Sequence, residues 1–173
     1  VGDDREALQS ALVVALEESD LVLVSGGTSV GAHDLIPELL NSLGPPGVLV
    51  HGMAMRPGKP VVVAVVGERP AFGLPGHPTS ALIIFHELVA PLIARATGAE
   101  AQRATVRARL SRNVPSQVGR EDIIRVRLEQ DDSGWRAVPV FAPSALITSL
   151  VQADGLVRIP VEAEGLYADE NVE

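Results

Sequence analysis

Hydrophobic and polar positions follow different periods in the two halves of the chain. Up to about residue 101, segments with apolar residues at helical spacing alternate with short apolar runs. Residues 4–18 place Leu8, Leu12 and Leu16 on one side of a helix, whereas residues 21–24 are all apolar and precede a glycine pair. The first pattern is typical of an amphipathic helix, and the second is typical of a buried parallel strand.

The rest of this half continues the alternation. Gly44 and Pro45 would end a second helix, and Pro78 suits the first position of a third. The expected elements are helices over 34–43 and 78–96 and strands over 48–51, 61–66 and about 71–73. Because helical and strand segments alternate, we expect right-handed crossovers. The prediction is an α/β three-layer domain over residues 1–101, with a mostly parallel sheet.

After residue 102 the pattern changes to period two. Residues 105–110 and 124–128 alternate apolar and polar side chains, and a polar turn at 131–134 precedes a further run at 135–141. Alternation over short runs indicates antiparallel strands with one face in water, and the turn is typical of a hairpin. Only residues 144–151 look helical here. We therefore expect a second, small antiparallel β-domain over residues 102–173.

Composition narrows the class of protein. Hydrophobic residues make up 46% of the chain but aromatic residues only 3%, so the core must consist mainly of aliphatic side chains. The most apolar stretch, residues 82–93, contains His86, Glu87 and Pro91, and no run approaches the roughly 20 residues that a membrane span needs. There is no cysteine, which excludes disulfides and thiolate sites. We expect no membrane span and, by default, a cytoplasmic location.

The charge balance argues against nucleic acid and leaves room for a small anion. The net charge is −8, whereas binding a phosphate backbone requires a basic patch. An anionic ligand remains possible where positive charge gathers locally. The first residue, Val1, is neither an initiator methionine nor part of a signal peptide, so we expect a piece of a longer chain.

The first candidate stretch is the glycine-rich segment 25–31, between a predicted strand and a predicted helix. Backbone N–H groups next to a helix start can cradle an anion at the carboxyl end of a strand. The segment lacks the Gly-Lys-Ser/Thr of a Walker loop and fails G-x-G-x-x-G. It formally matches the G-x-S-x-G elbow of hydrolases, but strand and helix do not flank Ser29 directly. A plain glycine-rich connection is the alternative.

Asp34 follows this segment and admits two interpretations. It can cap the helix that starts there, or it can hold a hard cation such as Mg²⁺ beside bound phosphates. The spacing alone does not separate the two.

The second candidate stretch is residues 56–60, Arg-Pro-Gly-Lys-Pro. It carries Arg56 and Lys59, the chain's single lysine, on a turn stiffened by prolines just before a buried strand. Fixed cations in an acidic chain suit an oxyanion or phosphate, because arginine offers a planar fork and lysine a point charge.

The third candidate stretch is residues 73–80, Gly-Leu-Pro-Gly-His-Pro-Thr-Ser, again between a strand and a helix. Its small residues would present backbone N–H groups at the same sheet edge as the glycine-rich segment. His77 can bind a ligand, but a histidine next to a helix N-terminus is more often a capping or packing residue. The other three histidines are scattered along the chain and show no metal-ligand spacing.

These three stretches, in this order and at this spacing, resemble the molybdopterin molybdenumtransferase family, which includes the E-domain of gephyrin. Residues 119–120 and 153–160 resemble the family's C-terminal β-barrel domain, so the likeness covers essentially the whole chain. It implies the family's last two domains, the second being a β-barrel, and a homodimer. The implied function is Mg²⁺-dependent insertion of molybdate into adenylylated molybdopterin.

The resemblance also implies roles for individual residues. Catalysis would use Asp3, Asp34 and Lys59, with Asp34 holding Mg²⁺. Molybdate would contact Arg56, Lys59, Arg120, Ser144 and Ser149. The nucleotide-linked pterin would contact Gly26, Gly27, Thr28, Ser29, Gly31, Pro75, Gly76 and Pro78.

Two positions depart from the family's pattern, and two other functions stay open. Gly52 stands where the family often has lysine, and His77 stands where it usually has asparagine. A molybdopterin adenylyltransferase-like enzyme shares the α/β domain but lacks the trailing β-domain. A non-catalytic dimeric scaffold of the same fold is the other alternative, and Gly52 favours it.

Overall fold

The computed structural model describes residues 4–26, 35–100, 103–141 and 147–173. The chain divides into two compact units. Unit 1 consists of Val1–Met53 and Gly58–Val89, and unit 2 consists of Ala54–Pro57 and Ala90–Glu173. Segment 54–57 therefore belongs to the second unit although residues of the first unit precede and follow it.

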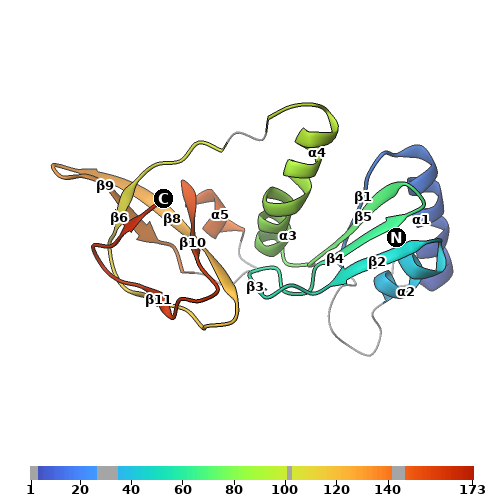
Figure 1. Ribbon diagram of the computed structural model, residues 1–173, viewed down its shortest axis with the longest axis horizontal. Helices are drawn as coiled ribbons and strands as arrows, with labels where there is room; N and C mark the ends of the chain where they lie inside the picture. Colours follow the sequence, from blue (N-terminus) through green and yellow to red (C-terminus); the bar gives the residue numbers. More distant parts are fainter. Residues whose placement is uncertain (1–3, 27–34, 101–102, 142–146) are drawn as a thin grey trace. The chain divides into compact units, whose positions relative to one another are not determined.

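Unit 1 is a sheet with helices on both faces. Figure 1 shows α1 and α2 on one side of the sheet and α3 on the other. In chain order its elements are α1 (Arg5–Glu18), β1 (Val22–Ser25), α2 (Leu35–Ser42), β2 (Pro46–His51), β4 (Val62–Val66), β5 (Arg69–Leu74), α3 (Pro78–Ile84) and the π-helical turn η1 (Phe85–Val89). The strand order is β1-β5-β4-β2.

The helices predicted for this unit form where their apolar faces meet the sheet. Asp4 caps α1, because its carboxylate accepts a hydrogen bond from the backbone N–H of Ala7 at 2.7 Å. The buried core that results is aliphatic, as the composition required. It comprises Leu12, Val22, Ile36, Leu39, Leu40, Val62, Ala64 and Ala71.

The expectation of a mostly parallel sheet is wrong for the strands described. Only β1 and β5 pair in parallel, whereas β5 with β4 and β4 with β2 pair antiparallel. The connection between β4 and β5 is a tight turn that pairs Val66 with Arg69, and Gly67 adopts the positive φ of 61° that this turn needs. Parallel neighbours require a long crossover, and no helix lies between β2 and β5.

The helix predicted over 78–96 is confirmed, with a π-helical turn in its middle: α3, η1 and α4 (Ala90–Ala96) follow one another without a gap. Pro91 cannot donate a hydrogen bond to the carbonyl of Glu87, and this missing bond lies where the helix widens into η1. The segment Pro78–Ala96, with mean hydropathy 1.4, is long and apolar enough to cross a membrane by length and composition. Buried core helices meet the same criterion, so the prediction that the chain has no membrane span stays a prediction.

Unit 2 is built from short strands around a second core. Its elements are β3 (Met55–Arg56), α4 (Ala90–Ala96), β6 (Ala108–Leu110), β7 (Val114–Pro115), β8 (Glu121–Asp131), β9 (Gly134–Pro139), α5 (Thr148–Val151), β10 (Gly155–Ile159), β11 (Gly165–Leu166) and β12 (Asn171–Val172). The larger sheet has the order β10-β8-β9-β6-β12, with β3 added beside β8, and β11 pairs with β7. The core residues are Ala108, Leu110, Val114, Val126, Ala137, Val157, Ile159 and Val172.

The hairpin predicted in this unit is confirmed, and the purely antiparallel sheet is wrong. Strands β8 and β9 pair antiparallel up to Asp131 opposite Gly134, at the expected turn. However, β6 pairs with β9 in parallel, and β3 pairs with β8 in parallel. Period-two alternation shows which face of the sheet is exposed to solvent, and it carries no information on strand direction. Closure of this sheet into a barrel stays a prediction.

Candidate functional site

The glycine-rich segment and the third candidate stretch start side by side. Because β1 and β5 are parallel neighbours, their carboxyl ends meet at one sheet edge. The backbone N–H of Gly26 donates to the carbonyl of Leu74 at 3.0 Å. A Cβ on Gly76 would lie 3.7 Å from the Cα of Gly26. The shared edge that the sequence predicted is therefore present where both segments begin.

Several predicted site residues lie outside the part of the chain that the structure describes. They are Asp3, Gly27, Thr28, Ser29, Gly31, Asp34 and Ser144. Their roles in binding the pterin, the molybdate and Mg²⁺ stay predictions.

The segment after β5 leads directly into α3. Pro75 is buried, whereas Gly76, His77 and Pro78 are exposed. His77 occupies the N-cap position of α3 without a side-chain capping bond, and Pro78 is the first helical residue, as predicted. The carbonyl of His77 accepts from the N–H of Ala81 at 3.0 Å. His77 thus caps through its backbone only, and its imidazole faces outward.

The Lys59 turn is held by its backbone. The N–H of Met53 donates to the carbonyl of Lys59 at 2.9 Å, and the N–H of Val61 donates to the carbonyl of Gly58 at 3.1 Å. Lys59 itself is exposed. The turn therefore fixes where the lysine begins and leaves its side chain in water.

Gly52, the departure from the family's pattern, has a structural reason. Its φ is +85°, a conformation that residues with a Cβ rarely adopt, and a Cβ there would lie 3.4 Å from the carbonyl oxygen of Lys59. The glycine therefore permits the chain to turn beside the Lys59 carbonyl. A lysine at this position would strain the backbone as it stands.

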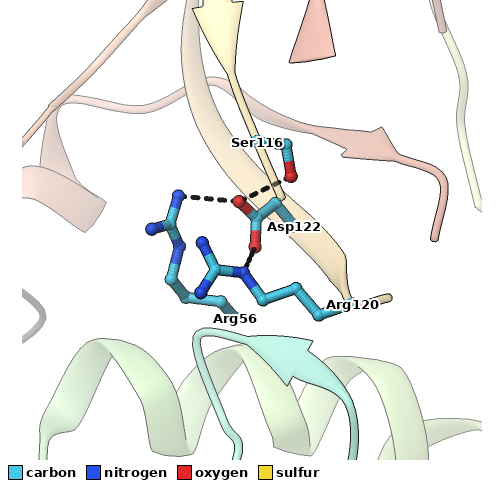
Figure 2. A network of polar contacts seen from close by, with 4 residues as sticks. All are labelled: Arg56, Ser116, Arg120 and Asp122. Atoms are coloured by element: carbon cyan, nitrogen blue, oxygen red, sulfur yellow. Dashed lines mark hydrogen bonds and ion pairs between the residues drawn. The ribbon is translucent and has the colours of Figure 1, made fainter. Parts of the chain in front are cut away.

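In unit 2, two of the predicted molybdate residues converge on one buried carboxylate. Figure 2 shows Arg56 and Arg120 reaching Asp122 from different segments of the chain. A guanidinium nitrogen of Arg56 lies 2.7 Å from Oδ2 of Asp122, and Nε of Arg120 lies 2.9 Å from Oδ1. The hydroxyl of Ser116 also donates to Oδ2, at 2.9 Å. The side chain of Asp122 is fully buried.

Local strand pairing builds this network. Segment 54–57 adds β3 to the edge of β8, with Arg56 opposite Asp122 in the register. The backbone N–H of Glu121 donates to the carbonyl of Ala54 at 2.8 Å and closes this pairing. Arg120 follows a turn in which Gly119 has φ +93°, which favours glycine. The network thus depends on one short strand and one turn.

The network leaves positive charge at the surface. Two guanidinium groups and one carboxylate, +1, +1 and −1, sum to +1. Each guanidinium carries five N–H donors, and one from each is recorded as bound to Asp122. The side chains of Arg56 and Arg120 are 52% and 31% exposed, so their remaining donors can reach a ligand in solvent. The arrangement is suited to an oxyanion.

Sequence reasoning missed Asp122 and Ser116. Residues 120–124 read Arg-Glu-Asp-Ile-Ile, which does not alternate, so the sequence offered only a weak signal: an acidic residue directly before the apolar pair Ile123 and Ile124. An acid buried among apolar residues needs a partner, and Arg120 is a candidate two residues away.

Ser149, another predicted molybdate residue, has a different contact. Its side chain is buried on α5, and its hydroxyl accepts a hydrogen bond from Arg125 of β8. Burial lowers the pKa of Arg125 from its ordinary value. The structure thus joins Arg56 to Arg120 and places Ser149 against Arg125.

The described residues contain no ready-made metal site. Nowhere among them do three or more histidine, aspartate or glutamate side chains gather as metal ligands. The predicted Mg²⁺ ligand, Asp34, is not one of these residues.

Comparisons with known protein families match the chain in two separate segments. Residues 1–95 match the family described as "Probable molybdopterin binding domain", and residues 107–173 match the "MoeA C-terminal region (domain IV)". The chain is 34% identical to the putative molybdopterin biosynthesis protein MJ0666 of Methanocaldococcus jannaschii, over 100% of this chain and 40% of the relative. It is 31% identical to the molybdopterin molybdenumtransferase of Haemophilus influenzae, over 98% of this chain and 43% of the relative.

A solved structure shows the same fold. The crystal structure of the molybdopterin biosynthesis moeA protein from Pyrococcus horikosii superimposes with a TM-score of 0.82 at 41% identity, covering 98% of this chain and 40% of that one. The chain thus spans less than half the length of these relatives.

Proposed function

Because the chain belongs to the MoeA-like family of molybdopterin molybdenumtransferases, which act in molybdenum cofactor biosynthesis, we propose that it inserts molybdate into adenylylated molybdopterin. The proposal concerns the whole protein, since this chain matches only 43% of the Haemophilus influenzae enzyme. The substrates are the nucleotide-linked pterin and molybdate.

The observation that carries the proposal is the pairing of Arg56 with Arg120. Arg56 was selected for oxyanion contact from its own candidate stretch, and Arg120 was selected through the family resemblance. Their guanidinium groups bind the same buried carboxylate and leave their outer donors exposed. Two guanidinium groups held side by side can bind a tetrahedral dianion such as molybdate with higher affinity than either group alone.

The chain's own residues would act by binding and positioning. Lys59 would add a charge to the oxyanion, while the segments that begin at Gly26 and Gly76 would offer backbone N–H groups to the pyrophosphate. When bound, Mg²⁺ would neutralise phosphate charge, with Asp34 as its proposed ligand and Asp3 as a further acidic group. Most of the rate would come from placing molybdate beside the dithiolene and stabilising charge on the departing AMP.

Two further properties belong to the same proposal. We expect a homodimer, because members of the family resembled here use that state, and a cytoplasmic location. In the proposed active site, Ser144 and Ser149 would lie on the side that binds molybdate. Neither a nucleic acid nor a membrane is a proposed partner.

The alternatives differ in what they need from unit 2. A molybdopterin adenylyltransferase-like enzyme would not need the segment that matches domain IV, residues 107–173, which favours the molybdenumtransferase. A non-catalytic scaffold would keep the fold without the oxyanion site. The positive φ of Gly52 weakens the argument for a scaffold, because the missing lysine has a backbone explanation.

Calorimetric titration of the whole protein with molybdate tests the proposal. We expect saturable binding that weakens about tenfold in Arg120→Gln, since one charge-assisted contact contributes roughly 1.5–3 kcal/mol. Arg158→Gln is the matched control, because Arg158 is an exposed arginine whose recorded partner is Glu121 rather than Asp122. The absence of binding heat in the wild type would favour the scaffold.

A further inference from the structure

We propose that Asp122 is a positioning residue that fixes the guanidinium groups of Arg56 and Arg120 as one clamp for a tetrahedral oxyanion. The inference rests on the proposed function, because it takes molybdate as the ligand. Asp122 itself would not touch the anion. It would act through the two arginines.

The geometry of the carboxylate supports this role. Each oxygen of Asp122 binds a different arginine, Oδ2 to Arg56 at 2.7 Å and Oδ1 to Arg120 at 2.9 Å. Figure 2 shows the two guanidinium groups meeting at this carboxylate. A single group that accepts from both arginines holds them at one separation and orientation. Preorganised donors lose less conformational entropy when a ligand binds.

Burial and hydrogen bonding hold the carboxylate itself in place. Asp122 is fully buried, lies within β8, and accepts a further hydrogen bond from Ser116 at 2.9 Å. By contrast, Arg56 and Arg120 are 52% and 31% exposed. The Asp122 carboxylate is therefore fixed in place away from water, while the guanidinium groups that it orients reach the solvent.

The charge of Asp122 also keeps two like charges together. Two guanidinium groups that share a ligand repel each other, and the carboxylate offsets one of the two charges. However, the same negative charge repels an incoming anion. Removing this charge therefore weakens anion binding by releasing the two arginines and strengthens it by removing the repulsion. Weaker net binding indicates that Asp122 positions the arginines, whereas tighter net binding indicates that only its charge matters.

The variant Asp122→Asn tests the inference in the whole protein. It keeps the shape of the side chain and removes its charge. If Asp122 positions the arginines, the molybdate Kd rises about tenfold, and so does the half-saturating molybdate concentration in turnover. The kcat at saturating molybdate stays within about twofold, because the pterin site is untouched. If Asp122 acts only through its charge, molybdate binds more tightly.

Glu121→Gln is the matched control. It removes the same charge from the neighbouring residue of β8, which pairs with Arg158 and not with the clamp. We expect its molybdate Kd to stay within about twofold of wild type. Thermal melts of all variants identify any loss of folding.

A milder variant keeps the test decisive if Asp122→Asn does not fold. Ser116→Ala removes one hydrogen bond from Oδ2 and leaves every charge in place. We expect its molybdate Kd to rise two- to threefold, and an unchanged Kd would overturn the inference. Unchanged or tighter binding by folded Asp122→Asn would overturn it as well. Failure of the wild type to bind molybdate would instead overturn the proposed function, and the inference with it.

Discussion

At the scale of single residues, the sequence identified the cationic site residues but not the buried carboxylate that binds them. Arg56 was selected as a fixed cation in an acidic chain and Arg120 through the family resemblance, and the structure places both on Asp122. Their partner was missed because a buried acid inside a strand pattern looks like an ordinary polar position. Whether two side chains meet depends on strand register, which residue type does not encode.

Lys59 provides the first residue-scale prediction. Its side chain is exposed and its backbone is held by the bond from Met53, so Lys59→Ala should leave folding unchanged. Loss of a charge-assisted contact to molybdate should lower molybdate-dependent turnover about ten- to a hundredfold. Steady-state rates and thermal melts of the whole protein measure both effects. Wild-type turnover in the variant would exclude the role assigned to Lys59.

Asp34 provides the second. If it only caps a helix, Asp34→Asn should be nearly silent, because asparagine caps about as well as aspartate. If it holds Mg²⁺ beside the phosphates, the loss of its charge should remove most activity and raise the Mg²⁺ requirement. Rates measured against Mg²⁺ concentration separate these outcomes. Curves that superimpose would leave Asp34 as a cap.

At the scale of elements, periodicity predicted which segments are helices and strands but not how the strands run. The helix over 4–18 and the hairpin at 131–134 form as expected, since spacing and turn residues are local signals. Strand direction depends on the connections, and the tight turn at Gly67 makes β4 and β5 antiparallel. The added strand β3 has only two residues, too short to show a period.

The β8–β9 hairpin provides a prediction about how the stability of the fold depends on pH. The Ser133 hydroxyl, and then its backbone N–H, lower the pKa of Asp131 from its ordinary value of 3.8. A carboxylate whose folded pKa is depressed stabilises the fold above its unfolded pKa and loses that effect as the pH falls through its folded pKa. The stabilisation is therefore present at pH 6 and fades below about pH 4.

Asp131→Asn tests this dependence. The melting temperature of the wild type should exceed that of the variant at pH 6, and the difference should shrink as the pH falls below about 4. The effect should be small, because Asp131 is exposed and its interactions are screened by water and salt. A difference that stays constant across this pH range would show that the charge of Asp131 does not stabilise the turn.

At the scale of the whole molecule, two units combine in one chain that matches two segments of one family. The order of the three candidate stretches allowed the resemblance to be recognised from sequence, whereas each stretch alone fits several kinds of site. Placement of the stretches within the units required the structure. Segment 54–57 shows why, since it carries Arg56 out of the surrounding unit and into a pairing with β8.

Release of AMP from adenylylated molybdopterin, measured in the whole protein as the molybdate concentration is varied, tests the central claim most directly. We predict that release requires molybdate and saturates with it, and that Arg120→Gln shifts the half-saturating concentration upward about tenfold, as expected for one lost charge-assisted contact. AMP release that does not respond to molybdate, or no release with both substrates present, would contradict the assignment of this chain to a molybdate-inserting enzyme.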